Sequence, residues 1–134
     1  MVLGNLNWLA VVLATVAYFA IGFLWYTVLF GSTWIRLMGK TREEMGSPGP
    51  GYAITVVAEL ISAIVLAVII GAMGIKTVTD GALAGLLLGV GIVATAYGIE
   101  SIFAGRSAPL YLINVGYHVV ALIVMGAILG HLHP

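Results

Sequence analysis

The chain is 134 residues long, 62% hydrophobic and only 7% charged, with a formal net charge of zero and no cysteine. Ordinary soluble domains carry about a quarter charged residues, so this composition indicates an integral membrane protein. Zero net charge and the lack of a basic tract leave no electrostatic basis for binding nucleic acid. Without cysteine, the chain cannot form disulfides, thiolate metal sites or a cysteine nucleophile.

Uncharged apolar segments recur along the chain, and about 20 residues of helix span the ~30 Å hydrocarbon core of a bilayer. These segments are continuously apolar and rich in Gly and Ala, which favours helices over the alternating strands of a barrel. We therefore predict an all-α fold, with residues 1–134 forming a single membrane domain that is a four-transmembrane-helix bundle. The predicted spans cover residues 6–30, 53–73, 81–103 and 110–129.

Aromatic residues mark both ends of the first span, residues 6–30. Trp8 lies at one end, and Trp25, Tyr26 and Trp34 lie near the other. Amphipathic rings prefer the membrane interface, so the simplest interpretation is that they anchor the helix in lipid and pack against other helices. The span lacks the basic start and the cleavage site of a secretory signal, and we expect it to remain in the mature protein.

The polar connection over residues 32–51 follows. Apolar and basic residues around Trp34 predict a short helix that lies in the membrane interface. Thr41 and Glu44 have the spacing of a capping box, which predicts that another turn of helix begins at Arg42. The Gly- and Pro-rich residues 46–51 then predict a break before the second span.

A carboxylic acid, Glu59, lies inside the apolar second span. It shares one helical face with small or polar residues, whereas branched side chains occupy the opposite face. That division is typical of membrane helices that contact other helices, so we predict that Glu59 points into the protein. Lipid cannot solvate the acid, which therefore needs partners from other spans. The shared face contains Ser62, Ala63, Leu66, Ala67 and Ile70.

Small residues at four-residue intervals predict close contact between helices. Gly81, Gly85 and Gly89 open the third span in this spacing, and Gly126 and Gly130 form a similar pair in the last span. Glycine at this spacing lets two helix backbones approach closely in a membrane. The contact is expected either within the bundle or between subunits.

Five polar residues are predicted to share one layer of the membrane: Tyr26, Glu59, Glu100, Asn114 and His118. At ~1.5 Å per helical residue, Glu59 and His118 each lie roughly 10 Å from the cytoplasmic ends of their spans. Two acids and an imidazole in a low-dielectric layer should share protons, because an isolated charge there is costly. A contact between Glu59 and His118 is the simplest arrangement.

A weak internal repeat relates the second and fourth spans. Residues 59–71 align without gaps to residues 118–130, and the alignment sets Glu59 opposite His118. Such a repeat predicts two helical hairpins in parallel orientation.

Basic residues are distributed unequally between the connections. Arg36, Lys40, Arg42 and Arg106 lie between spans one and two or between spans three and four, whereas the connection between spans two and three carries Lys76. Because basic residues favour the cytoplasmic side, both termini are predicted to lie outside the cytoplasm.

Three interpretations of the polar layer remain open. It can be a scaffold network that fixes helix packing, a proton-linked transport or channel site, or a metal site made of Glu59, Glu100 and His118. The third has no ligand-spacing signature, and we predict neither a metal site nor a cofactor. No nucleophile lies beside a base, which argues against an enzyme. Four spans are few to enclose a pathway, so we expect a homo-oligomer within the lipid bilayer.

Motifs along the whole chain resemble those of one known family. They are Asn7-Trp8-Leu9, Leu24-Trp25-Tyr26 followed by Leu29, Phe30, Gly31 and Trp34, then Met38-Gly39, and finally Asn114, Gly116, Tyr117 and His118. Together they resemble the prokaryotic membrane proteins grouped as domain of unknown function 1761. The resemblance implies four membrane helices in a bacterial or archaeal plasma membrane. It implies no activity.

Overall fold

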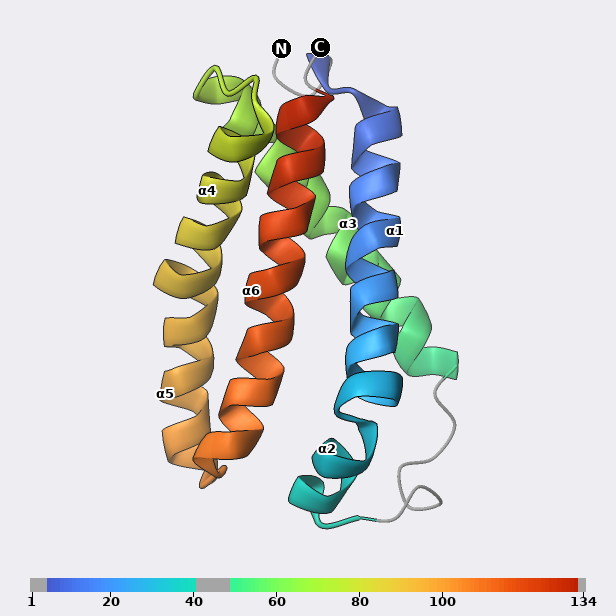
Figure 1. The fold of residues 1–134 in the computed structure, drawn as a ribbon, viewed down its shortest axis with the longest axis vertical. Coiled ribbons are helices and arrows are strands. Elements are labelled where there is room, and N and C mark those ends of the chain that lie inside the picture. Colours follow the sequence, from blue (N-terminus) through green and yellow to red (C-terminus); the bar gives the residue numbers. More distant parts are fainter. Residues whose placement is uncertain (1–4, 41–48, 133–134) are drawn as a thin grey trace.

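The computed structural model describes residues 5–40 and 49–132 of the chain. All regular structure in these two segments is helical, and four helices are long and apolar enough to cross a bilayer. The all-α, four-span membrane architecture is thereby confirmed (Figure 1). The spans are Trp8–Leu29, Gly49–Ala72, Val78–Ala104 and Ala108–His131. The capping box predicted at Thr41 and Glu44 lies outside the described residues.

The last helix, α6 (Ala108–His131), lies at the centre of the bundle. Figure 1 shows α4 (Val78–Leu88) and α5 (Thr95–Ala104) on one side of α6, and α1 (Trp8–Leu24) on the other. Behind them, α3 (Gly49–Ala72) crosses at an oblique angle, so the repeated segments on α3 and α6 are inclined differently.

The two ends of the bundle carry different elements. α1 begins and α6 ends at one end, where α3 also connects to α4. The short helix α2 (Gly31–Met38) and the turn between α5 and α6 lie at the other end. The short helix predicted around Trp34 is therefore present, directly after the first span.

Side-chain caps define the starts of three spans. Asn7, Thr77 and Ser107 each precede a helix and accept a hydrogen bond from a backbone N–H three residues later, over 3.1–3.4 Å. Such caps satisfy donors that the first helical turn leaves unpaired. They explain why the third and fourth spans begin earlier than the apolar runs predict.

The second span also starts earlier than predicted, at Gly49 instead of residue 53. The Gly- and Pro-rich segment was expected to break the chain as far as residue 51. Pro50 instead lies in the first helical turn, where its missing N–H leaves no bond unmade and its fixed φ suits a helix.

Two wide π-helical turns interrupt the spans, at η2 (Trp25–Leu29) and η4 (Gly89–Ala94). A π-turn inserts one extra residue, so side chains after it appear on a different face of the helix. After η4, Tyr97 is half-buried and Ser101 is buried, whereas Glu100 is exposed. In an uninterrupted α-helix Glu100 would share the face of Gly89, Val93 and Ala96, which was the basis for expecting it in the buried layer. With η4 in place, that expectation was wrong.

The inward face predicted for the second span is confirmed except at Ser62, which is half-buried and bonds the Ala58 carbonyl of its own helix. Its buried residues on α3 are Glu59, Ala63, Leu66, Ala67 and Ile70. They join a core with buried residues of α1 and α6. The outward sides of the spans expose large apolar side chains such as Leu9, Ile61 and Leu87, as a lipid environment requires.

The five glycines predicted to form close contacts all lie between α4 and α6: Gly81, Gly85, Gly89, Gly126 and Gly130. A Cβ added at Gly81 would overlap the carbonyl oxygen of Gly126, and one added at Gly85 would overlap that of Leu122. The two backbones therefore touch along this line within one subunit, and only glycine permits that approach.

We expect Gly85→Ala to destabilise the fold, because its methyl group would meet backbone atoms that cannot rotate away. Overpacking of this kind costs about 1–3 kcal/mol. Gly91→Ala is the matched control in the same span, since a Cβ at Gly91 meets nothing within 4 Å. Thermal unfolding in detergent measures both variants. Equal melting temperatures for the two variants would show that the α4–α6 contact is not as close as described.

Candidate functional site

His118 lies in the middle of α6 with both ring nitrogens hydrogen-bonded to tyrosines. The hydroxyl of Tyr18, on α1, lies 2.5 Å from Nδ1, and the hydroxyl of Tyr97, on α5, lies 3.0 Å from Nε2. A neutral imidazole donates through one nitrogen and accepts through the other, and a tyrosine hydroxyl can do either. The three side chains therefore form a relay, Tyr18–His118–Tyr97, across three helices.

Glu59 has a different tyrosine partner. Its side chain is 4% exposed, and its Oε2 accepts a hydrogen bond of 2.6 Å from the hydroxyl of Tyr117. Its other oxygen, Oε1, is buried and has no hydrogen-bond partner among the described residues. Buried polar atoms without a partner are rare and costly, and they call for a specific explanation.

The predicted contact between Glu59 and His118 was wrong. Within residues 5–40 and 49–132, no hydrogen bond or ion pair joins the two side chains, because tyrosine hydroxyls occupy them instead. Tyr117 precedes His118 on α6 and so points toward α3, while His118 points toward α1 and α5. The rings of Tyr18 and Tyr117 meet edge to face at 5.4 Å. Acid and imidazole thus share one aromatic cluster without touching.

The wide turn η2 directs two aromatic residues toward α6. Trp25 donates from Nε1 to the backbone oxygen of Ile113 over 2.9 Å, and Tyr26 donates to Oδ1 of Asn114 over 2.8 Å. Both rings are half-buried. The aromatic residues at this end of the first span were expected to anchor it in lipid and to pack against other helices, and Trp25 and Tyr26 do pack against α6. Trp34 packs against Tyr26, with ring centroids 5.1 Å apart.

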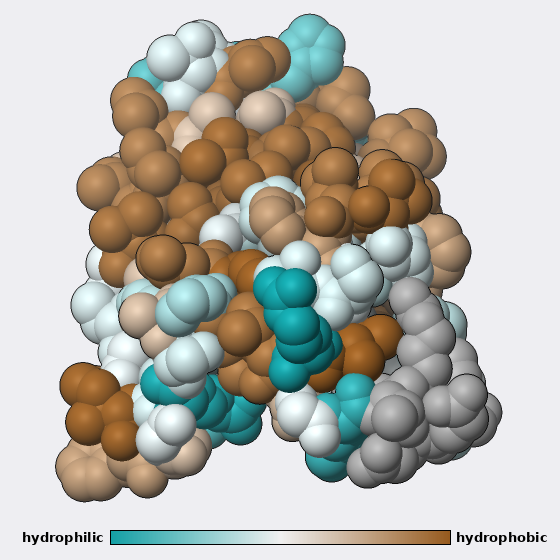
Figure 2. All heavy atoms as spheres, turned by 60° about the horizontal axis from the view of Figure 1, so that its bottom comes forward, coloured by the Kyte–Doolittle hydropathy of each residue, from teal (hydrophilic) through white to brown (hydrophobic). Residues whose placement is uncertain are grey.

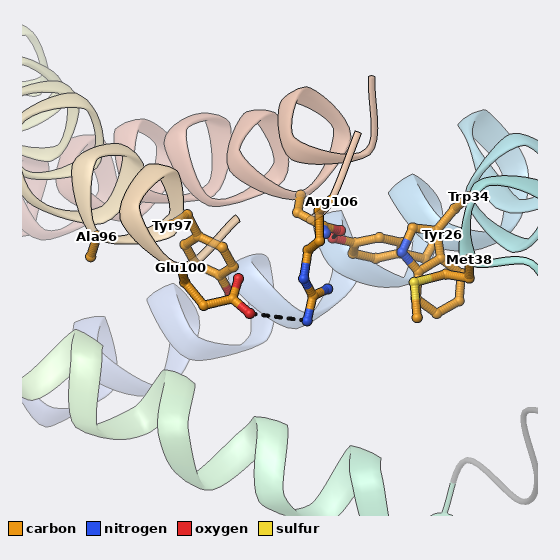
Figure 3. A pocket seen from close by; sticks show the side chains of 8 residues that line it. Tyr26, Trp34, Met38, Ala96, Tyr97, Glu100 and Arg106 are labelled. Carbon is orange, nitrogen blue, oxygen red and sulfur yellow. Dashed lines mark hydrogen bonds and ion pairs between the residues drawn. The ribbon is translucent and has the colours of Figure 1, made fainter. Parts of the chain in front are cut away.

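An open cleft of about 470 Å³ lies beside this cluster. Figure 3 shows Tyr97 and Glu100 on one side of Arg106, and Tyr26, Trp34 and Met38 on the other. In Figure 2, hydrophobic side chains cover most of the view, and hydrophilic ones gather at the hollowed end that carries α2 and the α5–α6 turn. Because Tyr97 lines the cleft and also bonds His118, the relay begins at the cleft wall.

Glu100 lies in the cleft and forms an ion pair of 3.1 Å with Arg106. It is separated from the buried cluster, and Glu59 and His118 have partners of their own. Among the described residues, no three His, Asp or Glu side chains gather in a way that could hold a metal ion. The interpretation as a metal site of Glu59, Glu100 and His118 therefore has no geometric support.

Glu59 and His118 lie farther from the starts of their helices than predicted, because both helices start earlier. Glu59 and His118 each follow ten residues of helix, which is about 15 Å of helix axis. That distance is near the middle of a ~30 Å hydrocarbon core. The buried residues between this level and the far end are apolar apart from Thr15, whose hydroxyl donates to the Val11 carbonyl one turn away. The hydrogen-bonded polar side chains that begin at the cleft therefore reach this level, and beyond it Thr15 is the buried polar residue of the described chain.

Three tyrosines were not predicted as site residues, namely Tyr18, Tyr97 and Tyr117. Their position in the sequence does contain a signal, since each lies in the interior of a span and not at an interface. A buried tyrosine hydroxyl needs a hydrogen-bond partner. Tyrosine in the interior of an apolar span therefore indicates a polar side chain or an accessible carbonyl on a neighbouring helix.

Comparison with known proteins assigns a family and nothing further. The family model described as "Protein of unknown function (DUF1761)" matches residues 9–130, a range that contains the whole tyrosine cluster and the cleft. No curated protein and no solved structure matches the chain.

We expect Tyr117→Phe to destabilise the protein by ~1–3 kcal/mol, because the buried carboxyl of Glu59 then loses its hydrogen-bond donor. Tyr111→Phe is the matched control on the same helix. It removes a hydroxyl that donates to the Ala94 carbonyl over 2.7 Å and makes no bond to Glu59 or His118, and its loss should cost about 1 kcal/mol. Equilibrium unfolding in mixed micelles compares the two. An equal loss of stability in Tyr111→Phe would show that the hydrogen bond from Tyr117 to Glu59 contributes no more than an ordinary one.

Proposed function

This chain belongs to the family described as "Protein of unknown function (DUF1761)", and from the geometry of its midplane cluster we propose that it is a proton-linked membrane carrier. The observation that supports this proposal is the hydrogen bonding of both His118 nitrogens to tyrosine hydroxyls, one of which lines an open cleft. Imidazole inside a membrane span is costly and typically belongs to an ion or proton pathway.

The relay can move a proton with little rearrangement. A proton that reaches Tyr97 from the cleft can pass to Nε2 of His118, which makes the ring an imidazolium with two N–H donors. The Nδ1 proton then passes to the Tyr18 oxygen while the Tyr18 hydroxyl gives its own proton to a water molecule that reaches it from the other side, which returns the ring to its neutral form. Rotation of the tyrosine hydroxyls resets the hydrogen bonds, and no helix has to move in this step.

Glu59 supplies the second protonatable group of the cluster. A positive His118 in the low-dielectric interior is stabilised by a negative carboxylate nearby, and a neutral His118 needs no such charge. Protons on the two residues are therefore linked, even though Tyr18 and Tyr117 separate them. The unpartnered Oε1 of Glu59 gives the acid a place to accept a proton or a donor during the cycle.

A carrier fits the apolar outer half of the bundle better than an open channel does. A channel needs polar groups or water along its whole length. In a carrier, the central site is exposed to one side at a time through movement of the helices. The described polar residues extend from the cleft to the midplane, which matches a central site with access from one side.

The structural scaffold remains the second candidate, and a specific observation favours it. The hydrogen bonds of the cluster join α1 and α5 to α6, and α6 to α3. Such bonds also fix how membrane helices pack. For a scaffold, removal of a hydroxyl should reduce stability without any effect on proton movement.

Proton flux into liposomes that contain the purified protein distinguishes these functions. We expect flux across about pH 5 to 8 in wild type, its loss in His118→Phe and a strong reduction in Tyr97→Phe, which keeps the ring and removes only the hydroxyl. Tyr111→Phe is the control and should retain wild-type flux. The flux is recorded without solute, with mixed amino acids and with glycine betaine.

Wild-type vesicles no more permeable than empty ones under all three conditions would favour the scaffold. A loss of flux that is equal in Tyr97→Phe and Tyr111→Phe would also count against the relay. Thermal unfolding of each variant before reconstitution separates loss of transport from loss of folding.

The proposal includes assembly into a homo-oligomer in a prokaryotic plasma membrane. A single subunit of four spans leaves the outer half of the pathway closed by apolar side chains. A neighbouring copy could supply the other wall of a path there. The exposed apolar sides of the spans suit either lipid or such a neighbour.

Both termini are proposed to lie outside the cytoplasm, so that the cleft opens toward the cytoplasm. Arg36, Lys40 and Arg106 lie at the cleft end of the bundle, and Lys76 lies at the other end. Because the sequence has no cysteine, single introduced cysteines report the orientation directly. Lys76→Cys should react with a membrane-impermeant maleimide in intact cells, and Ser107→Cys should react only after lysis. The reverse pattern of labelling would refute the orientation.

A further inference from the structure

The walls of the cleft differ in chemistry. Three aromatic rings line it, from Tyr26, Trp34 and Tyr97. The ion pair of Glu100 and Arg106 also lines it, and both charged side chains are accessible, at 51% and 37% exposure. A cleft that combines several aromatic faces with two accessible charges has the features of a small-molecule site, and its volume is in the usual range.

The aromatic wall and Glu100 together suit an ammonium group. Tyr97 and Glu100 lie three residues apart on α5, so they project to neighbouring positions, as Figure 3 shows. The face of an aromatic ring attracts a cation, more strongly where water is excluded. The half-exposed carboxylate adds a hydrogen-bonding counter-charge for the same group.

Arg106 and Asn114 suit an oxoanion. A guanidinium carries five N–H donors, and the bond to Glu100 engages Nη2, so other donors remain for a ligand. The Oδ1 atom of Asn114 already accepts from Tyr26, which leaves its amide hydrogens as the groups it can offer. Both residues therefore present donors to the same cleft.

We propose that the cleft binds a zwitterion that carries both an ammonium and an oxoanion, such as a phosphate or carboxylate. Opposite charges lie 3.1 Å apart in the Glu100–Arg106 pair. A ligand of one sign would be attracted by one residue and repelled by the other, whereas a zwitterion in antiparallel alignment is attracted by both. The role of this ligand as the cargo of the carrier rests on the proposed function, whereas its binding to the cleft does not.

The ligand can come from water or from the membrane, because the same chemistry occurs in dissolved solutes and in lipid headgroups. The strongly exposed apolar residues Ile102 (79%) and Phe103 (87%) lie on α5 two and three positions after Glu100. Acyl chains of a lipid whose headgroup enters the cleft could lie along such residues. The experiment therefore needs one arm for each source.

The soluble arm is calorimetric titration of the purified protein in detergent with phosphocholine and with O-phosphoethanolamine. Ethanolamine and inorganic phosphate serve as half-ligands that carry one charge each. We expect the zwitterions to bind roughly tenfold or more tightly than either half-ligand, since each half-ligand loses one charge-assisted interaction. The lipid arm is native mass spectrometry of protein equilibrated with phosphatidylethanolamine or phosphatidylglycerol, with the zwitterionic lipid expected to be retained.

The variants Glu100→Gln and Arg106→Gln should each weaken binding of the zwitterion by roughly tenfold or more. Lys76→Gln, at the opposite end of the bundle, is the matched loss of one charge and should bind like wild type. All three positions are exposed, so the variants should fold. Retention of phosphatidylethanolamine without binding of either soluble zwitterion would identify a lipid as the source, and soluble binding would identify a dissolved solute.

Two results would overturn the inference. One is equal affinity within an arm, either of a half-ligand and a soluble zwitterion or of phosphatidylglycerol and phosphatidylethanolamine. The other is the absence of zwitterion binding in both arms. Unchanged affinity in both Glu100→Gln and Arg106→Gln would overturn it as well. Zwitterion binding together with absence of proton flux would support the inference and overturn the carrier, so the two failures are distinguishable.

Discussion

The need of a buried acid and a buried imidazole for hydrogen-bond partners, which lipid cannot supply, constrains most of this structure. Glu59 and His118 lie near the middle of apolar helices, where no water is at hand to solvate them. Their partners are tyrosines from three helices, Tyr18, Tyr97 and Tyr117. The cluster therefore specifies which helices meet at this level and how each is rotated about its axis.

Close backbone packing and the polar cluster divide the bundle into two different regions. Glycine brings α4 and α6 into direct contact over the half of the bundle that lies beyond the midplane. On the cleft side, bulky aromatic residues from η2 and α2 line an open cleft together with residues of α5 and α6. Glycines allow the helices to pack closely in one half of the bundle, and aromatic residues line an open cleft in the other half. The site lies at the boundary between them.

The spans and the inward face of α3 could be predicted from sequence, because both follow from apolar length and from the 3.6-residue period of a helix. The partners of Glu59 and His118 could not, since periodicity orients a residue on its own helix without showing what a neighbouring helix presents. Glu100 shows a further limit. Its predicted place depended on regular helix geometry through residues 89–94, and the wide turn η4 makes that assumption false.

The wide turn η4 makes the register of the third span as important as its hydrophobicity. Each residue of an α-helix advances the side-chain direction by about 100°, so a regular α-helix over the same residues 89–94 would rotate every later side chain by about that angle. That span would be just as apolar and long enough to cross a bilayer, yet Tyr97 would turn away from His118. Two relatives with the same hydropathy profile could therefore differ in whether the relay exists at all. A relative that is one residue shorter within 89–94 would direct its tyrosine at the histidine from a regular α-helix, so the position of the tyrosine in the helix register is a better guide to the relay in this family than overall composition.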